Sequence, residues 1–413
     1  MKSVKLFRNG TVATTDTPQG TVATTTMPEI TLITGLAGLL SLEKAWRKLE
    51  ANCSGHTSVF QSFDWIATWC EVYAGKAAKV ELHVLTGYDG DELVFVWPLM
   101  KQSRLGIKVL SWLTEPFGQY GDVLCANGHC SNRWIEASFG LLRRLKGIDI
   151  LRLRHVREDS HLAKSSMQFF SDAKSNERAP FLDLTRFASE QDYEQRYTPT
   201  PRTRRKKIRK HLEDIGPVTF TRLPAGTLAD AAIENAIAEK NQWLNDRARY
   251  NRVVHCPGHT DFLKKLSRRF GGTTEVIVSE LKAGDQPVSW EIGFRHGKTH
   301  FAYLTSHMNA HTDLSPGRLH MDLSQRASLE AGMQRFDLMV PYDPHKESWS
   351  SGCAATKDYF APLSASGWLA GHVYLGTIRP VVQKLYYTLQ PTVLRWLRTR
   401  GNIKVSVMMS WFS

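Results

Sequence analysis

The sequence predicts an α/β protein built from two similar units. Segments with the alternating hydrophobic residues of strands are interspersed with segments of helical periodicity. The same order of elements, a strand hairpin followed by a helix and another strand, occurs in both halves of the chain. Residues 144–151 and 330–339 show the likeness most clearly, because in each a helix runs into a strand through an aspartate. We therefore expect two copies of one α/β unit.

The composition is that of an ordinary globular protein. With 413 residues, of which 42% are hydrophobic, the chain is long enough for two or three domains. No apolar run approaches the roughly 20 residues that span a bilayer, and residues 1–10 lack the long apolar core of a secretion signal. We expect a cytoplasmic protein.

The cysteines argue against disulfides and against a metal site. All six are scattered along the chain, which fits reduced thiols inside a cell. Cysteine and histidine occur together at residues 125–130 and 255–259, but neither stretch has the paired spacing of a zinc site. We expect no metal.

The net charge of +13 is concentrated in two places. Residues 202–210 carry seven cations, and residues 359–413 carry six cations and no acidic residue, so these thirteen charges equal the whole excess. The rest of the chain is balanced, and no zinc-finger or RNP-type motif accompanies the charge. The charge pattern therefore does not indicate a nucleic-acid partner.

The first unit is expected at residues 30–180, after a threonine-rich tail at residues 1–29 that repeats Gly-Thr-Val-Ala-Thr-Thr and lacks large apolar residues. Aromatic residues at helical spacing in residues 60–69 are most simply core. The expected elements are helices at 39–51 and 133–146, and strands at 80–86, 93–100, 108–113 and 148–153.

The second unit is expected at residues 181–362 and has the same order of secondary-structure elements. Turns at residues 284–287 and 296–297 separate three strand patterns. The expected elements are helices at 202–214, 228–247 and 261–270, strands at 218–223, 275–281, 288–295, 300–304 and 336–340, and a helix that begins at residue 315.

A turn at Ser315, Pro316 and Gly317 opens the last of these helices, whose residues Leu319 and Leu323 are spaced for a buried face. The first free N–H groups of such a helix, together with the positive end of its dipole, suit an anion such as a pyrophosphate. The alternative is an ordinary helix N-cap by Ser315.

The order of the elements, together with residues 284–288, 314–317, 330–332 and 336–337 and the pair Lys346 and Trp349, resembles the CelD-like branch of the GNAT acetyltransferases. This branch is related to the FemAB-type transferases, which have two tandem GNAT-like domains. The likeness extends over about residues 35–362 and is strongest at 286–349. It implies tandem domains, each a mixed and mostly antiparallel sheet flanked by helices. It also implies an acyl-CoA-dependent transferase that acts on a cell-envelope saccharide or polysaccharide precursor, as in cellulose biosynthesis.

For this chain, the resemblance implies that acetyl-CoA or another acyl-CoA binds at Ser315, Gly317, Arg318 and Leu319 through backbone donors. Two departures from the family pattern stand beside this. The turn has one glycine where the family has two, and Lys346 follows His345 where the family usually has an aromatic residue.

Acyl transfer needs a base and donors for the developing oxyanion. Glu291 follows Trp290 on a hairpin strand, where GNAT enzymes often carry such groups; the alternative is a solvated carboxylate on the strand surface. His307 and His311 precede the glycine turn, and either is a candidate base.

Two further residues lie at the end of the last strand pattern. Lys346 follows that strand and is a candidate partner for a phosphate or carboxylate of the substrate. Asp337, within the strand, is expected to be a hydrogen-bonding residue at the junction of helix and strand.

Alternative functions remain open at this point. A FemAB-like transferase that uses aminoacyl-tRNA would use the cations at residues 202–210, for which a solvated helix face is the simpler reading. A non-catalytic scaffold in a polysaccharide biosynthesis complex would explain the reduced glycine turn. No dinucleotide-binding or P-loop pattern is present.

The C-terminal segment, residues 363–413, is expected to be a basic amphipathic tail. Its cations, leucines and Trp396 suit the surface of an anionic membrane, so we expect the protein to lie at the inner face of the membrane at least in part. The alternative is a C-terminal helix that packs on the body of the protein.

Overall fold

A computed structural model describes residues 28–381, apart from residues 54–57, 75–79, 105, 130–131, 166–167, 248, 270, 272–273 and 380. The expected N-terminal tail and most of the expected C-terminal tail lie outside these described residues.

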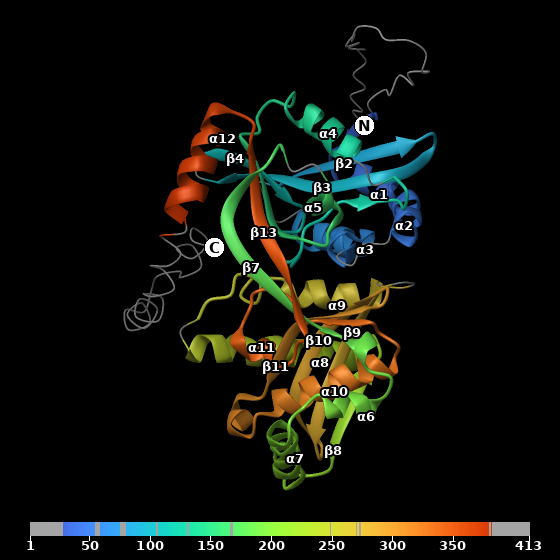
Figure 1. The fold of residues 1–413 in the computed structure, drawn as a ribbon, viewed down its shortest axis with the longest axis vertical. Coiled ribbons are helices and arrows are strands. Elements are labelled where there is room, and N and C mark those ends of the chain that lie inside the picture. Colours follow the sequence, from blue (N-terminus) through green and yellow to red (C-terminus); the bar gives the residue numbers. More distant parts are fainter. Residues whose placement is uncertain are drawn as a thin grey trace.

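One continuous sheet of 13 strands runs through both halves of the molecule (Figure 1). The strand order is β1-β2-β3-β4-β6-β13-β7-β12-β11-β10-β9-β8, and β5 pairs with β3. Of the strand pairs, only β4–β6 and β11–β12 are parallel within the described residues. The expected α/β class with a mixed, mostly antiparallel sheet is therefore confirmed.

The elements of the first half are β1 (Ile30–Ile33), α1 (Leu36–Ser41), α2 (Glu43–Ala51), η1 (Ser58–Gln61), α3 (Phe63–Trp69), η2 (Cys70–Ala74), β2 (Glu81–Asp89), β3 (Glu92–Arg104), β4 (Ile107–Trp112), β5 (Leu124–Cys125), α4 (Asn132–Leu142), β6 (Ile150–Arg157), α5 (His161–Lys164) and β7 (Ser171–Asp183).

The second half contains η3 (Leu184–Arg186), α6 (Glu190–Gln195), α7 (Pro199–Glu213), β8 (Val218–Leu223), α8 (Thr227–Asp246), α9 (His259–Arg269), β9 (Thr274–Ala283), β10 (Gln286–His296), β11 (Thr299–His307), η4 (Asn309–Leu314), α10 (Pro316–Glu330), β12 (Arg335–Asp337), α11 (Pro344–Glu347), β13 (Gly352–Pro362), α12 (Ala365–Leu369) and η5 (Ala370–Ile378).

The repeat seen in the sequence has a structural counterpart. In the first half α4 connects β4 to β6, and in the second half α10 connects β11 to β12. Both connections join parallel neighbours in the sheet, as a strand–helix–strand crossover requires. The two halves thus contain the same parallel unit beside an antiparallel hairpin.

The long strands β7 and β13 join the halves, running side by side through the middle of the molecule (Figure 1). β7 pairs with β13 over most of its length and with β12 at Phe181–Asp183, while β13 also pairs with β6. The expected domain boundary between residues 180 and 181 therefore lies inside one strand, and the chain returns to the first half through β13.

The hydrophobic core is also continuous between the halves. The aromatic segment at residues 60–69 is buried, as expected, and its Trp65 ring lies 5.1 Å from that of Phe294 on β10. Phe60 likewise meets Phe301 on β11, with 6.1 Å between the ring centroids. Edge-on contacts of this kind stabilise aromatic clusters, so the first half supports the strands that form the site.

The chain after β13 departs from the expected tail. Helix α12 and η5 pack on the sheet so closely that a Cβ atom at Gly367 would collide with the carbonyl oxygen of Asp149, and one at Gly371 would collide with Phe360. Arg379, counted among the tail cations, is buried and pairs with Asp358. Residues 365–379 therefore belong to the folded body, which is the alternative considered from the sequence. Within the described part of the chain, no helix is both long and apolar enough to cross a membrane.

Candidate functional site

A wedge opens in the sheet between β11 and β12. The two strands pair only at Thr299–Phe301 of β11, and β11 then continues beside β10 alone. After Asp337 the chain turns away, with Met339 in the left-handed region at φ 62°. Within residues 302–307, the alternate backbone N–H and C=O groups that point away from β10 therefore form an open strand edge, which can accept an extended ligand.

The N-terminus of α10 lies at the wide end of this wedge. Ser315 occupies the N-cap position at φ 55° and its side chain makes no capping hydrogen bond, so the hydroxyl cap considered from the sequence is not formed. A Cβ atom at Gly317 would have only Nδ1 of His307 within 4 Å, at 3.9 Å. The first turn of α10 thus faces open space, with His307 beside it, as an anion site would require.

Cations surround this helix end. Burial and the nearby Lys240 and Arg247 lower the pKa of His307, so its imidazole is neutral at neutral pH. Arg318 donates from Nη2 to Nδ1 of His345 at 3.3 Å, and burial followed by the neighbouring Arg204 lowers the pKa of its guanidinium. Like charges drawn together at a helix N-terminus favour a bound anion.

Two of the remaining predicted residues are placed differently. Leu319 is buried against Ile208 and Leu212 of α7, so its side chain packs in a core and does not face a ligand at the helix end. His311 lies on η4, and its Nε2 atom is buried without a hydrogen-bond partner within the described part of the chain.

Lys346 lies on the opposite side of the wedge. Its ammonium donates to the carbonyl oxygens of Met339 and Pro341, at 3.0 and 2.9 Å. Burial lowers its pKa to about 8, although Asp337 acts in the other direction. An amine with this pKa is neutral in about a tenth of the molecules at pH 7, enough to serve as a base.

Glu291 is neither on the strand surface nor open to a substrate. It is completely buried on the face of β10 that α10 covers, where its Oε1 accepts from His300 at 2.7 Å and from Ser324 at 2.9 Å. Burial acts to raise the pKa of Glu291, but the hydrogen bond from His300 and the electrostatic effect of that residue lower it. The net pKa is below the ordinary value, so the carboxylate is ionised. Gly293 leaves room for this pair, because a Cβ atom there would lie 2.7 Å from His300 Nε2. The solvated carboxylate considered from the sequence is therefore wrong, and Glu291 fastens α10 to the sheet.

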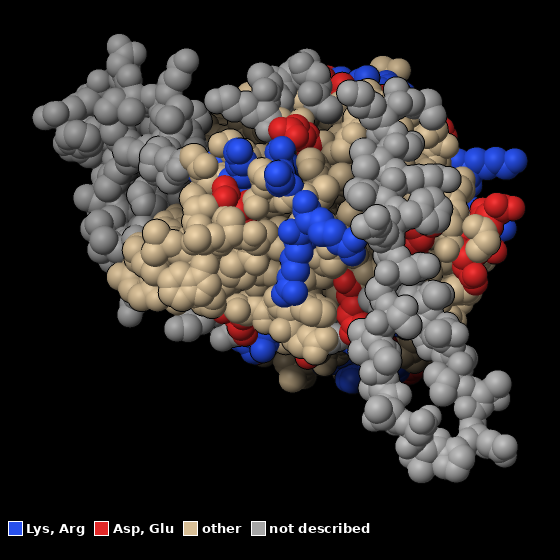
Figure 2. Space-filling view, turned by 90° about the horizontal axis from the view of Figure 1, so that it is seen from above, with Lys and Arg blue, Asp and Glu red and all other residues tan. Residues whose placement is uncertain are grey.

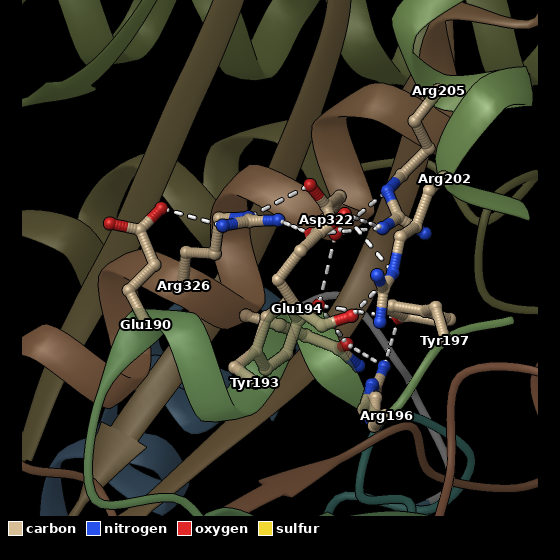
Figure 3. Close-up of polar contacts among 10 residues, drawn as sticks. Glu190, Tyr193, Glu194, Arg196, Tyr197, Arg202, Arg205, Asp322 and Arg326 are labelled. Atoms are coloured by element: carbon tan, nitrogen blue, oxygen red, sulfur yellow. Dashed lines mark hydrogen bonds and ion pairs between the residues drawn. The ribbon is translucent and has the colours of Figure 1, made fainter. Parts of the chain in front are cut away.

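The outer face of α10 is held by a second polar network (Figure 3). Arg326 binds Glu190, Glu194 and Asp322, and Arg205 of α7 binds Glu194 and Asp322 at 3.0 and 3.2 Å. Arg202 also donates to the backbone carbonyl of Glu194. Two of the seven cations at residues 202–210, Arg202 and Arg205, are therefore engaged in this network. The network aligns α6, α7 and α10.

Sequence reasoning missed Lys240 and Tyr303. Lys240 projects from α8 against Trp243, 5.0 Å from the ring centroid, in a stretch that has no motif. Tyr303 lies on the open part of β11 and donates to the carbonyl of Phe117 at 3.3 Å. The alternation of β11 places Tyr303 and His307 on one face, which is the only signal that the sequence offered.

The wedge and the N-terminus of α10 both lie in a region that matches a known family. A family model described as an acetyltransferase (GNAT) domain matches residues 202–347. This match confirms, for residues 202–347, the resemblance to GNAT acetyltransferases seen in the sequence. A search of the curated proteins found no match.

One solved structure supports the fold over most of the chain. A crystal structure of FemX is similar to this chain with a TM-score of 0.52 and 9% identity, over 84% of this chain and 98% of FemX. A tandem GNAT protein from the clavulanic acid biosynthesis pathway has a TM-score of 0.45 and 12% identity, over 81% of this chain and 99% of that protein. At this identity the likeness to FemX concerns the fold alone.

If Glu291 fastens α10 to the sheet, Glu291→Gln should lower the free energy of unfolding by about 1–3 kcal/mol, because charge-assisted hydrogen bonds are lost in a buried place. Urea melts measure this, with Glu275→Gln as the control, since Glu275 is an exposed carboxylate whose pair with Arg295 spans 3.4 Å. Unchanged stability of the Glu291 variant would show that the group is not structural.

Proposed function

We propose that this protein transfers an acyl group from acyl-CoA to an amine or hydroxyl group of a cell-envelope saccharide or its precursor. One observation carries the proposal for the donor. The open edge of β11 leads to the uncovered first turn of α10, so an extended chain with amides and a terminal pyrophosphate fits both features in succession.

The length of acyl-CoA decides between the candidate bases. A pyrophosphate at Gly317 puts the thioester roughly 15 Å away, since the connecting arm equals about four or five extended residues. Along β11 that distance leads from His307 back to Tyr303, near the narrow end of the wedge. His307 therefore contacts the phosphates, together with Arg318, and is not the base.

Lys346 is then the base. It is held by carbonyls that follow β12, and its electrostatic partner Asp337 lies where the two strands part. In its neutral form Lys346 takes the proton of the attacking amine or hydroxyl, the acyl carbon passes to that atom, and CoA leaves as the thiolate. Lys240 adds positive charge in the same region.

The aminoacyl-tRNA alternative is less well supported. It requires an array of free cations on α7, but Arg202 and Arg205 are engaged with Glu194 (Figure 3). A scaffold without a donor site is not favoured either, because the turn before α10 stays open despite its single glycine.

Peripheral membrane attachment is also part of the proposal. Helix α12 and η5 have no charged residue and expose Trp368 and Leu369 by 55% and 58%. Figure 2 shows lysine and arginine side chains gathered near the middle of the end face, with largely uncharged surface towards the side on which α12 lies in Figure 1. An exposed tryptophan, on a molecule whose end face also carries cations, suits the headgroup region of an anionic membrane.

The donor site is tested by titrating the protein with acetyl-CoA and longer acyl-CoAs in a calorimeter. Gly317→Val should weaken binding at least tenfold, or about 1.4 kcal/mol, because its side chain fits the folded protein but fills the place of the anion. Lys346→Met is the matched control, since it alters the acceptor side of the wedge. Equal affinity in a folded Gly317→Val protein would contradict the donor site.

Membrane attachment is tested by sedimentation with vesicles. The intact chain should pellet with anionic vesicles, should stay in solution with neutral vesicles, and should be released by salt. Substitution of Trp368 and Leu369 by serine should reduce the pelleted fraction severalfold, whereas Leu228→Ser, at an exposed leucine of α8, should not. Equal pelleting of the double variant and the intact chain would rule out α12 as the contact.

A further inference from the structure

A cluster of five arginines lies outside the site described above. Arg104 ends β3, Arg152 and Arg154 belong to β6, Arg252 lies between α8 and α9, and Arg379 follows η5. They surround two carboxylates, Glu115 after β4 and Asp358 on β13. We refer to these seven residues as the arginine cluster.

Four ion pairs within the arginine cluster are long. Glu115 Oε1 lies 3.9 Å from Nη2 of Arg152 and 3.6 Å from Nη1 of Arg154. Asp358 Oδ2 lies 3.6 Å from Nε of Arg154 and 3.4 Å from Nη1 of Arg379. Well-formed arginine–carboxylate bonds measure about 2.7–2.9 Å. The carboxylates therefore stand between the arginines without closing a tight pair with any of them.

Several buried polar atoms here lack partners. Arg152 is only 8% exposed, yet among the described residues neither its Nε nor its Nη2 has a hydrogen-bond partner. The same holds for both carboxylate oxygens of Glu115 and for Nη1 of Arg252. Buried charged groups normally have their hydrogen bonds satisfied, so this arrangement is costly unless another group completes it.

The charges in the cluster do not balance. Five guanidinium groups face two carboxylates, which leaves an excess of three positive charges in a largely buried place. Burial lowers the pKa of Arg152 to about 9, with Arg379, Arg154 and Arg104 acting in the same direction against Glu115. His155, also beside Asp358, adds no charge, because burial and Arg154 lower its pKa to about 4.

The arginine cluster has an inner and an outer side. Arg152 forms the floor, while Arg154 is 20% exposed and Arg104 and Arg252 are half-buried. A ligand can therefore approach the outer three guanidinium groups, with the charge of Arg152 behind them.

We propose that the arginine cluster binds a diphosphate group. Three excess charges match an anion that carries two or three charges, and several guanidinium forks suit the oxygens of two linked phosphoryl groups. Glu115 lies between Arg152 and Arg154 and holds their guanidinium groups apart. Such a group occurs in nucleotide-linked and in lipid-linked sugars, both of which are activated saccharide precursors.

If the proposed acyl transfer holds, this diphosphate belongs to the acceptor. The backbone carbonyl of Phe117, two residues after Glu115, accepts a hydrogen bond from the hydroxyl of Tyr303 on the open part of β11. The segment that carries Glu115 of the arginine cluster thus also contacts the wedge, and a saccharide attached to the diphosphate extends towards it. This assignment rests on the proposed function, whereas anion binding does not.

The test titrates inorganic pyrophosphate into the intact protein in the presence of saturating CoA, at constant ionic strength, so that the α10 site is occupied. Binding should be retained under CoA and should weaken at least tenfold in Arg152→Gln. The melting temperature of the ligand-free variant should equal or exceed that of the native protein. Glu115 keeps its ion pair with Arg154, and the repulsion between Arg152 and the other arginines is removed. Arg186→Gln, at a 61% exposed arginine, is the control and should change neither quantity.

A lowered melting temperature with unchanged pyrophosphate affinity would make Arg152 a structural residue and overturn the proposal, as would absence of pyrophosphate binding. Arg252→Gln, which alters a loop, serves as a second variant with the same expected loss of affinity. Titration with UDP and with geranyl diphosphate then distinguishes a nucleotide-linked from a lipid-linked source. If pyrophosphate binds through Arg152 while acyl-CoA fails to bind, the anion site stands and the proposed function fails.

Discussion

A buried ion pair between Arg157 and Asp337 joins the two halves of the sheet where the wedge begins. Both side chains are 1% exposed, and Asp337 also accepts the hydroxyl of Tyr120 at 2.7 Å and the backbone N–H of Met339 at 2.8 Å. Arg157 ends β6 and Asp337 ends β12, so the pair connects corresponding strands of the two units. Removing one partner of a buried pair costs about 3–5 kcal/mol, because the other charge remains buried. Asp337 is a hydrogen-bonding residue, as expected, but its side-chain partners Arg157 and Tyr120 come from the first half and not from the junction of helix and strand.

The geometry of the site follows from that junction. Because Asp337 is fixed by the first half, the chain after β12 leaves β11 at a defined point, and the carbonyls that hold Lys346 follow directly. On the other side, Glu291 and the network around Arg326 fix both faces of α10, and thereby the direction of its N-terminus. Separate sets of buried charges thus fix the N-terminus of α10 and the position of Lys346.

The sequence was sufficient for elements with a strong local pattern. The strand at residues 218–223 has the expected bounds, and the helix after Ser315 begins where the Pro-Gly turn predicts. The strands β7 and β13 were not predicted, because residues 171–178 are mostly polar and their strand conformation depends on pairing with partners far along the chain. The two strands that connect the halves were therefore the least visible in the sequence.

In the candidate site, too, residues in local motifs could be predicted and residues that depend on distant partners could not. Gly317, Arg318 and His307 were chosen from local motifs, and the structure brings them together. Sequence alone could not place Glu291 inside the protein, since a carboxylate on a strand is usually exposed and its partner His300 comes from the next strand. The assignment of Lys346 as base depends on the separation between two ends of a strand, which no sequence pattern reports.

Hydrogen–deuterium exchange with and without acetyl-CoA tests the central claim, that an acyl donor lies along β11 with its phosphates on α10. The account predicts slower exchange of the amides at residues 302–307 and 317–319 when acetyl-CoA is present, because the ligand takes up backbone groups that the fold leaves open. Unchanged exchange in both segments under saturating ligand, or protection confined to other parts of the chain, would contradict it.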